Sequence, residues 1–331
     1  MTPEEGFAIA YHHYSNERFG DAENACRQIL NVFPAHTETW MLYALMLQRV
    51  GKTAEANQLL HSGMQNRVQT IRLDAYYDGQ SRWMPHKRLE ALIQPSLNFY
   101  DNVIKSFEHF LPWLGKIDFD ADSTRPASPH WNNPWLPVLD AVALYCFVSQ
   151  RRPRTYVEIG SGNSTKFVAR AVADHGLSTR IISIDPKPRA DIDQLCHEVI
   201  RQPLEKCNLR LFDSLGENDI VFADNSHRSF MNSDATVFFC EIMPGLRSGV
   251  VVGIHDIFLP FDYPADWDLR YYSEQYLLAC WLLAGTHKFE TLLPMYYVSE
   301  KGSGATLLRS VRDRITIPGW HAGSSFWIRI C

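Results

Sequence analysis

A glycine-rich turn is the first feature of this sequence with the makings of a chemical site. The apolar run Thr155–Ile159 leads into Gly160-Ser161-Gly162-Asn163 and then into a helical pattern. Glycines at such a turn let a ligand approach the backbone, and the start of a helix offers unpaired N–H groups. The next apolar run ends in Asp185, whose carboxylate can accept hydrogen bonds from both hydroxyls of a ribose. The pattern therefore predicts a nucleoside ligand.

Two residues beside this turn indicate which nucleoside is bound. The dinucleotide fingerprint has a third glycine that allows close helix packing, but Thr165 stands at that position here. Glu158, just before the glycines, suits a ligand that carries an ammonium group and would repel a pyrophosphate. Both residues disfavour NAD. An NAD-dependent oxidoreductase is therefore the less favoured alternative to the function considered below.

Polar side chains follow two later predicted strands. Asp224-Asn225-Ser226-His227 comes after one strand, and His255-Asp256 comes after the next. Because the carboxyl ends of neighbouring parallel strands open toward the same crevice, we expect these residues to converge.

Two catalytic routes are open for this convergence. If the substrate is a hydroxyl, His227 or His255 can take its proton, and Asp256 belongs to the same catalytic group. Alternatively, Asp224 and Asp256 can bind Mg²⁺, which would lower the pKa of that hydroxyl. Histidine is a more natural ligand for a softer metal than for magnesium.

The sequence resembles a family of bacterial class I S-adenosylmethionine-dependent methyltransferases, of the kind that methylates oxygen atoms of small molecules or sugars. The resemblance rests on segments 158–165, 184–189, 224–227 and 254–257. It implies S-adenosylmethionine as cofactor and a small molecule or glycan precursor as acceptor. It also implies a set of cofactor-binding residues, in which Glu158 and the glycines lie near the methionine end, Asp185 on the ribose, and two residues after the third strand near the adenine. The set is Glu158, Gly160, Gly162, Asn163, Asp185, Asp213, Ser214 and Asp224.

The region from Arg154 onward alternates short apolar strands with helical patterns, which predicts a parallel sheet covered on both faces. The expected fold class is α/β, with a Rossmann-like, doubly wound, seven-stranded sheet of the methyltransferase type. Strands are expected at 155–159, 180–185, 208–212, 219–224, 249–254, 291–298 and 325–330. Helices are expected at 164–175, 189–201, 232–244 and 269–284.

The N-terminal part predicts a small all-α domain. Residues 4–66 have helical periodicity, and the phrase at 19–25 recurs loosely at 50–56, a spacing of 31 residues. The pattern resembles a tetratricopeptide repeat. The expected domains are 1–70, a lead-in at 71–150, and the catalytic domain at 151–331. Because two repeats form a short stack, the helices are expected to pack on the rest of the chain, a second copy or a protein partner. A non-catalytic scaffold is therefore the third function considered.

One further segment has two interpretations. Residues 258–267 are too rich in proline for a helix and suit either a lid or a loop packed on its own domain. Several side chains are also expected near the site, without a spacing argument that selects among them: Arg189, Arg228, Arg270, Tyr272, Glu274 and Gln275.

Composition excludes several classes of function. The formal net charge is -5 with acidic and basic residues interspersed, so no basic footprint for nucleic acid or anionic membrane exists. The first residues lack the pattern of a secretory signal, and the longest apolar runs are shorter than the ~20 residues a bilayer requires. The seven cysteines include no Cys-x-x-Cys pair, which argues against a disulfide framework or a thiolate zinc site. The sequence predicts a cytoplasmic protein that binds neither nucleic acid nor membrane.

Overall fold

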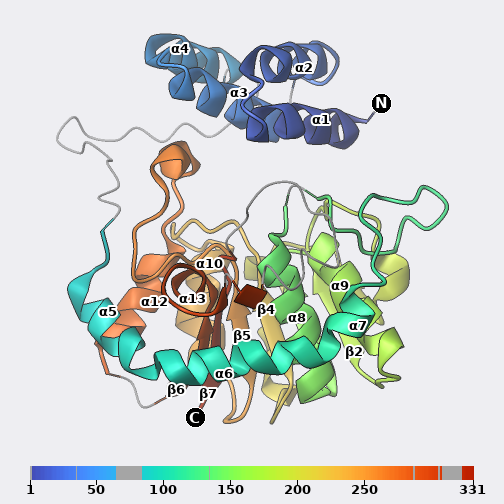
Figure 1. Ribbon diagram of the computed structural model, residues 1–331, viewed down its shortest axis with the longest axis vertical. Helices are drawn as coiled ribbons and strands as arrows, with labels where there is room; N and C mark the ends of the chain where they lie inside the picture. Colours follow the sequence, from blue (N-terminus) through green and yellow to red (C-terminus); the bar gives the residue numbers. More distant parts are fainter. Residues whose placement is uncertain are drawn as a thin grey trace. The chain divides into compact units, whose positions relative to one another are not determined.

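The computed structural model describes residues 2–34, 36–64, 84–133, 135–285, 288–304, 306–307 and 323–331. The chain forms two compact units, which Figure 1 shows in sequence colours. One unit comprises Met1–Trp83 with Tyr263–Tyr271, and the other comprises Met84–Asp262 with Tyr272–Cys331. The described part of the expected lead-in, from Met84 onward, thus belongs to the same unit as the sheet.

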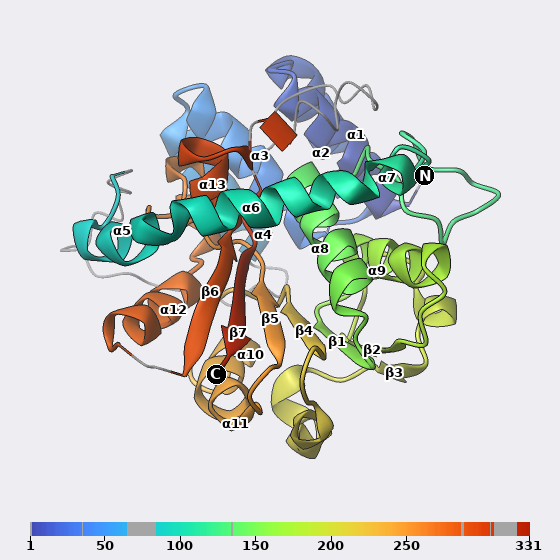
Figure 2. The same ribbon diagram turned by 60° about the horizontal axis from the view of Figure 1, so that its bottom comes forward.

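The larger unit is built on a seven-stranded sheet, which confirms the predicted fold class. The strand order is β3-β2-β1-β4-β5-β7-β6, and Figure 2 shows the strands side by side in this order. The first five strands in that order pair in parallel, whereas β7 is antiparallel to both of its neighbours. The strands are β1 Thr155–Ile159, β2 Arg180–Ile184, β3 Glu198–Ile200, β4 Ile220–Ala223, β5 Val251–Ile254, β6 Phe289–Pro294 and β7 Phe326–Ile330.

The central strands consist mainly of buried apolar residues. Every residue of β1, β4 and β5 is buried, as expected for parallel strands that are covered on both faces. Helix α6 crosses the strands beside α8, and α8 packs against α9 (Figure 2). The helices of this unit are α5 Lys87–Ile93, α6 Leu97–Phe107, α7 Leu111–Leu114, α8 Val138–Arg151, α9 Asn163–Asp174, α10 Asp234–Val237, α11 Met243–Gly245, α12 Glu274–Leu283 and α13 Met295–Lys301.

The third strand is where the sequence prediction was wrong. A strand was expected at 208–212 and a helix at 189–201, but β3 lies at Glu198–Ile200 and a 3-10 helix, η5, spans Leu209–Ser214. β3 is only half-buried at the edge of the sheet, so it lacks the continuous apolar run that identifies a central strand. In η5, the Asn208 side chain accepts a hydrogen bond from the Arg210 N–H and begins the 3-10 helix.

The smaller unit contains four helices among its described N-terminal residues: α1 Pro3–Ser15, α2 Phe19–Val32, α3 Thr37–Arg49 and α4 Thr53–Met64. Thr2 and Glu5 form a capping box at the start of α1. The starts of α1 and α3 are 34 residues apart, as are those of α2 and α4. This period is that of tetratricopeptide repeats and replaces the spacing of 31 suggested by the recurring phrase.

Residues 258–267, for which a lid and a packed loop were both considered, are divided between the two units. Its first part packs on the larger unit, because Phe258, Leu259 and Phe261 are buried and the buried Gln275 amide bonds the backbone of Phe258 and Phe261. Its second part, containing the 3-10 helix η7 (Ala265–Arg270), belongs to the smaller unit. Residues 258–262 are therefore a packed loop rather than a lid.

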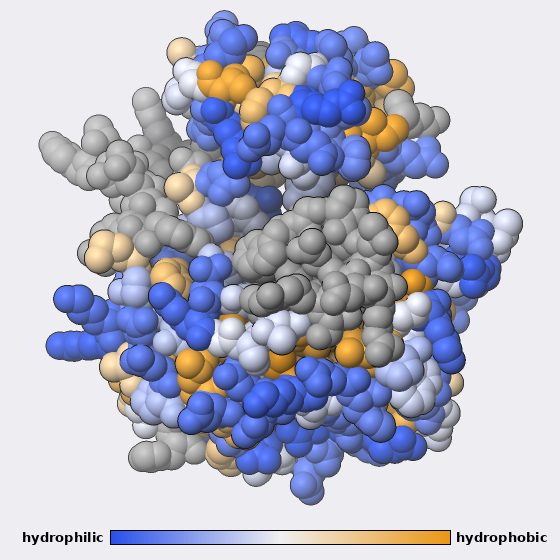
Figure 3. All heavy atoms as spheres, in the orientation of Figure 1, coloured by the Kyte–Doolittle hydropathy of each residue, from blue (hydrophilic) through white to orange (hydrophobic). Residues whose placement is uncertain are grey.

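No helix in the described part of the chain has the length and apolar character needed to span a membrane. The face drawn in Figure 3 is largely hydrophilic, and its hydrophobic spots are small and separate.

Candidate functional site

The turn after β1 packs directly on the turn after β4. Gly160 has a φ of +78°, a region in which glycine is favoured over other residues. A Cβ placed on Gly160 would lie 1.8 Å from the carbonyl oxygen of Asp224. Only a glycine therefore lets the two turns meet, and this contact brings the end of β4 against the predicted cofactor site.

Asp185 holds the same turn from the neighbouring strand. One carboxylate oxygen of this half-buried residue accepts a hydrogen bond of 2.7 Å from the N–H of Ser161, and the other accepts one of 2.7 Å from the N–H of Lys187. These bonds orient the carboxylate at the carboxyl end of β2. Carboxylate oxygens have further lone pairs, so Asp185 can still accept from ribose hydroxyls.

The surroundings of Gly162 show whether the turn has room for an adenosine cofactor. Gly162 is buried, but a Cβ built on it would meet only the Cβ of Arg189, at 3.9 Å, so space remains beside this glycine. Asn163, half-buried, begins α9 beside this opening. The Arg189 guanidinium stacks on the Trp135 ring with 4.2 Å to its centroid, next to the turn. An open glycine turn, a helix start and an oriented carboxylate form a cradle that fits S-adenosylmethionine.

Glu158 occupies a different place from the one predicted. Its carboxylate is 0% exposed and accepts hydrogen bonds from the hydroxyls of Tyr156 and Thr165. Burial, the largest influence, raises its pKa to about 7. Contrary to the prediction, Glu158 has no exposed surface with which to contact a ligand. It lies on the same covered face of β1 as Tyr156, since alternate residues share a face, and it anchors α9 from beneath the turn.

Two histidines meet at one oxygen of Asp224. His227 Nε2 and His255 Nδ1 each lie 3.2 Å from Asp224 Oδ1. Asp256 closes the group, with its Oδ2 3.5 Å from His227 Nε2 and its Oδ1 3.3 Å from His255 Nδ1. The structure thus brings together the polar residues that follow β4 and β5, and we call these four residues the Asp–His cluster.

A buried carboxylate faces the outer nitrogen of each histidine. Glu274, from α12, hydrogen-bonds to Nδ1 of His227. Asp140, from α8, has its Oδ2 3.3 Å from Nε2 of His255, although the two atoms are not aligned as a hydrogen bond. Glu274 was among the residues that sequence could not select, and Asp140 was missed. The signal for Asp140 was its position as the one charged residue in the apolar stretch 138–149.

The cluster is unequally accessible. The side chains of His227 and His255 are 4% and 2% exposed, whereas those of Asp224 and Asp256 are 19% and 10% exposed. The carboxylates therefore form the face that a substrate can reach. His227 and Asp256 also have positive φ angles of 60° and 55°, a strained backbone that is often found at functional sites.

Charge is concentrated in this small volume. Burial alone would lower the pKa of His227, but Glu274, Tyr272 and Asp224 raise it well above its ordinary range. The pKa of His255 is shifted in the same way: burial would lower it, but Asp256, Asp224 and Asp140 raise it. Conversely, burial would raise the pKa of Asp224, but the two histidines lower it. The histidines and carboxylates stabilise one another's charged forms.

The chemistry of this donor set also fits a divalent cation. Asp224, His227 and Asp256 each offer one ligand atom, and these atoms lie within 4.8 Å of one another. Both ring nitrogens of the buried His255 lack an aligned hydrogen bond, which leaves an unsatisfied polar group beside the carboxylates. Glu274 at the far nitrogen of His227 is the outer partner that metal-binding histidines usually have.

Two residues assigned to the adenine lie at the wrong edge of the sheet. Asp213 and Ser214 end η5, and the Ser214 carbonyl accepts a bond of 2.8 Å from Arg154, which precedes β1. They stand near the amino ends of the strands, whereas the glycine turn is at the carboxyl ends, so this prediction was wrong. The residue that follows β3 at the ligand edge is Arg201, which contacts the Ser183 hydroxyl at 3.0 Å and the Asp185 carbonyl at 3.2 Å.

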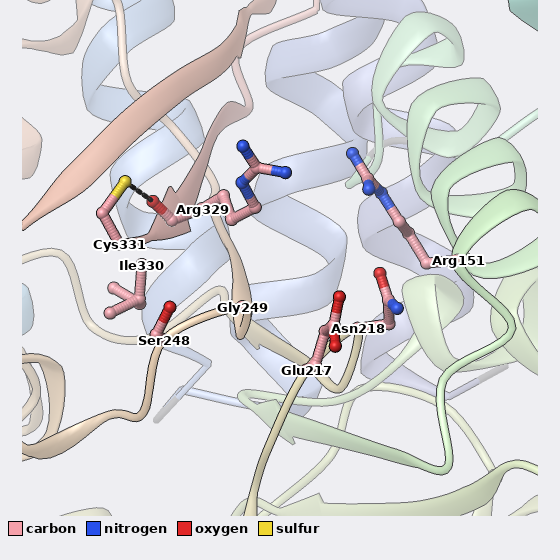
Figure 4. A pocket seen from close by; sticks show the side chains of 8 residues that line it. All are labelled: Arg151, Glu217, Asn218, Ser248, Gly249, Arg329, Ile330 and Cys331. Atoms are coloured by element: carbon pink, nitrogen blue, oxygen red, sulfur yellow. Dashed lines mark hydrogen bonds between the residues drawn. The ribbon is translucent and has the colours of Figure 1, made fainter.

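A separate hollow of about 350 Å³ lies at the opposite edge of the sheet (Figure 4). Arg151 and Arg329 face it, but so does Glu217, and Arg329 already pairs with Glu290. These opposite charges balance, so we do not assign a ligand to it. Its lining residues are Arg151, Glu217, Asn218, Ser248, Gly249, Arg329, Ile330 and Cys331.

Part of the chain matches a known family of domains. Residues 157–257 match the family model described as a methyltransferase domain. A search of curated proteins found no match. Among solved structures, the chain is similar to an S-adenosylhomocysteine-bound methyltransferase from Podospora anserina, with 12% identity, a TM-score of 0.35 and coverage of 80% of this chain and 100% of that one. It is also similar to a branched-chain polyamine synthase mutein from Thermus thermophilus, with 10% identity, a TM-score of 0.37 and coverage of 100% and 93%.

Proposed function

We propose that this class I S-adenosylmethionine-dependent methyltransferase methylates an oxygen atom of a small molecule or glycan precursor. The contact between Gly160 and Asp224 is the observation that carries the proposal. It joins the glycine turn to the Asp–His cluster, and this supports a hydroxyl acceptor beside the proposed cofactor site.

The mechanism rests on positioning and on proton removal. S-adenosylmethionine supplies an electrophilic methyl group when it is bound. Asp185 would hold the ribose, while the backbone beside Gly162 would receive the methionine end of the cofactor. Holding the acceptor oxygen in line with the methyl group removes much of the entropic part of the barrier.

The carboxylates rather than the histidines would meet the acceptor. Asp224 and Asp256 are the more exposed members of the cluster, and Asp256 would accept the hydroxyl proton. His227 and His255 lie behind them with both ring nitrogens facing carboxylates. This proposal differs from the histidine base considered from sequence, because it gives the proton to Asp256.

A divalent cation is compatible with the same site. Asp224, His227 and Asp256 would hold it, and it would lower the pKa of the acceptor hydroxyl. One nitrogen and two carboxylates suit Mn²⁺ or a softer ion better than Mg²⁺, which prefers oxygen ligands.

Methyl transfer from radiolabelled S-adenosylmethionine tests the proposal. Purified protein is incubated with separate panels of sugars, small hydroxylated molecules and primary amines, with and without Mn²⁺, and labelled products are identified by mass spectrometry. We expect label on a hydroxyl oxygen, and we expect Asp256→Asn to abolish it. Label on nitrogen only would contradict the oxygen acceptor. Calorimetric binding of NAD but not of S-adenosylhomocysteine would instead favour an oxidoreductase.

A further inference from the structure

Asp140 occupies an unusual place for an acidic residue. It lies in the first turn of α8, before the segment that matches the methyltransferase family model, and it is 0% exposed. A charged side chain without solvent is costly unless polar partners surround it. Its partners come from two elements that both border the Asp–His cluster.

The first partner is the chain just before β7. Asp140 Oδ2 accepts a hydrogen bond of 2.7 Å from the N–H of Ser324, and Oδ1 accepts one of 2.8 Å from the N–H of Ser325. A Cβ on Gly323 would lie 2.8 Å from Asp140 Oδ1, so the backbone passes close to the carboxylate. These bonds fix the orientation of the carboxylate.

The second partner is the cluster itself. The same Oδ2 atom lies 3.3 Å from His255 Nε2, and the Ser324 hydroxyl donates a bond of 3.1 Å to Asp256 Oδ1. Asp140 and Ser324 therefore contact two of the four cluster residues. Hydrogen bonds at active sites without ligand are commonly poorly aligned, so the unaligned contact at His255 is compatible with a role for Asp140.

Asp140 and Glu274 each place a carboxylate beside the outer ring nitrogen of one histidine of the cluster. Glu274 bonds the outer nitrogen of His227, and the inner nitrogen then faces Asp224 Oδ1. Asp140 faces the outer nitrogen of His255, whose inner nitrogen lies 3.2 Å from the same oxygen. A carboxylate beside one ring nitrogen favours a proton on that nitrogen and orients the ring.

We propose that Asp140 is a positioning residue of the active site, which holds a proton on Nε2 of His255 and directs Nδ1 toward Asp224. The inference rests on the proposed function, because it takes the Asp–His cluster as the place of the reaction. It extends the site to α8 and to the chain before β7, outside residues 157–257.

Asp219 provides a matched control for the structural role of such a carboxylate. Asp219 is likewise buried and accepts bonds from two backbone N–H groups, Thr155 at 2.7 Å and Gly216 at 2.9 Å. It lies at the amino edge of the sheet, far from the cluster in the strand register. Asp219 also pairs with Arg154 at 3.2 Å, so Asp219→Asn reports the cost of weakening a buried carboxylate and all its partners without touching a histidine.

Nitrogen NMR of protein labelled with ¹⁵N-histidine tests the proposal directly, with the His255 signals assigned from His255→Gln. We expect a protonated Nε2 in the wild type and in Asp219→Asn, and a shifted or exchange-broadened signal in Asp140→Asn. A wild-type Nε2 without a proton would overturn the proposal, and this result does not depend on the folding of Asp140→Asn. An Asp140→Asn spectrum identical to that of the wild type would overturn it as well.

Kinetics with the acceptor found in the methylation screen provide a second readout. Asp140→Asn should lower kcat by at least about tenfold while the Kd for S-adenosylhomocysteine stays within about twofold, and Asp219→Asn should change neither. Equal kcat values in the two variants would overturn the positioning role. If the wild type methylates nothing, the proposed function fails, whereas the NMR result still decides the role of Asp140.

Discussion

Gly160 and Asp224 approach so closely that a single added carbon on the glycine would lie 1.8 Å from the aspartate carbonyl oxygen. Through this contact, the turn proposed to bind the cofactor packs against the end of β4, where the Asp–His cluster begins. The proposed cofactor site and the proposed acceptor site therefore share one backbone contact. The predictions below separate the parts of that arrangement.

Gly160→Ala should impair both folding and cofactor binding. The clash with the Asp224 backbone cannot be relieved by rotating a side chain, so we expect a loss of about 2–3 kcal/mol in unfolding free energy. Gly176→Ala is the control, because Gly176 also has a positive φ, +55°, but meets nothing within 4 Å. Gly176→Ala should lower the free energy of unfolding by about 1 kcal/mol. Equal destabilisation in urea melts would show that strain, and not the clash, dominates.

Asp185→Ala should weaken binding of S-adenosylhomocysteine by roughly 10- to 100-fold, since each hydrogen bond to a charged group contributes about 1.5–3 kcal/mol. Isothermal titration calorimetry measures the affinity. Asp213→Ala should leave it unchanged, because Asp213 lies in η5 near the amino edge of the sheet. A loss of affinity in the Asp213 variant, with none in the Asp185 variant, would reverse both assignments.

These two residues also show how far sequence reasoning reaches. Asp185 was found because a buried apolar run and a terminal acid mark a central strand beside a glycine turn. Asp213 was misplaced because β3 is a half-buried, three-residue edge strand, too short to carry a hydrophobic period. The fold and the places of six of its seven strands could be predicted from their apolar runs, but the strand expected at 291–298 ends at Pro294 and α13 begins at Met295.

The Asp–His cluster was only partly accessible to such reasoning. His227, His255, Asp224 and Asp256 follow strands, so their convergence follows from the direction of parallel strands. Asp140 joins them from a helix that precedes the sheet, and no local spacing links it to His255. Which side chains face solvent also depends on packing, and packing made the histidines the most buried members.

Glu158 predicts a specific dependence of stability on pH. Its pKa is about 7 in the folded protein, above its ordinary value of 4.5, so the folded state binds more protons between these values. The stabilising contribution is complete below about pH 4.5 and is lost as the pH rises through 7. Between pH 5.5 and pH 8, the free energy of unfolding of the wild type should fall by about 2 kcal/mol more than that of Glu158→Gln. Urea unfolding at the two pH values measures this difference, and parallel losses in both proteins would contradict it.

Mn²⁺ binding tests the cation site apart from catalysis. Electron paramagnetic resonance of free Mn²⁺ should show binding to the wild type, and Asp256→Asn should weaken that binding by at least about tenfold through loss of a charged ligand. Asp219→Asn should bind Mn²⁺ as the wild type does, because Asp219 lies at the amino edge of the sheet, away from the cluster. Absence of Mn²⁺ binding in the wild type would contradict the cation site and leave the cofactor site untouched.

A crystal structure of the protein with S-adenosylhomocysteine tests the central claim most directly. The account predicts ribose hydroxyls within hydrogen-bond distance of Asp185, the ligand backbone against Gly162, and the sulfur atom facing Asp224 and Asp256. Adenosine bound at another edge of the sheet, or a sulfur atom directed away from the two carboxylates, would contradict it.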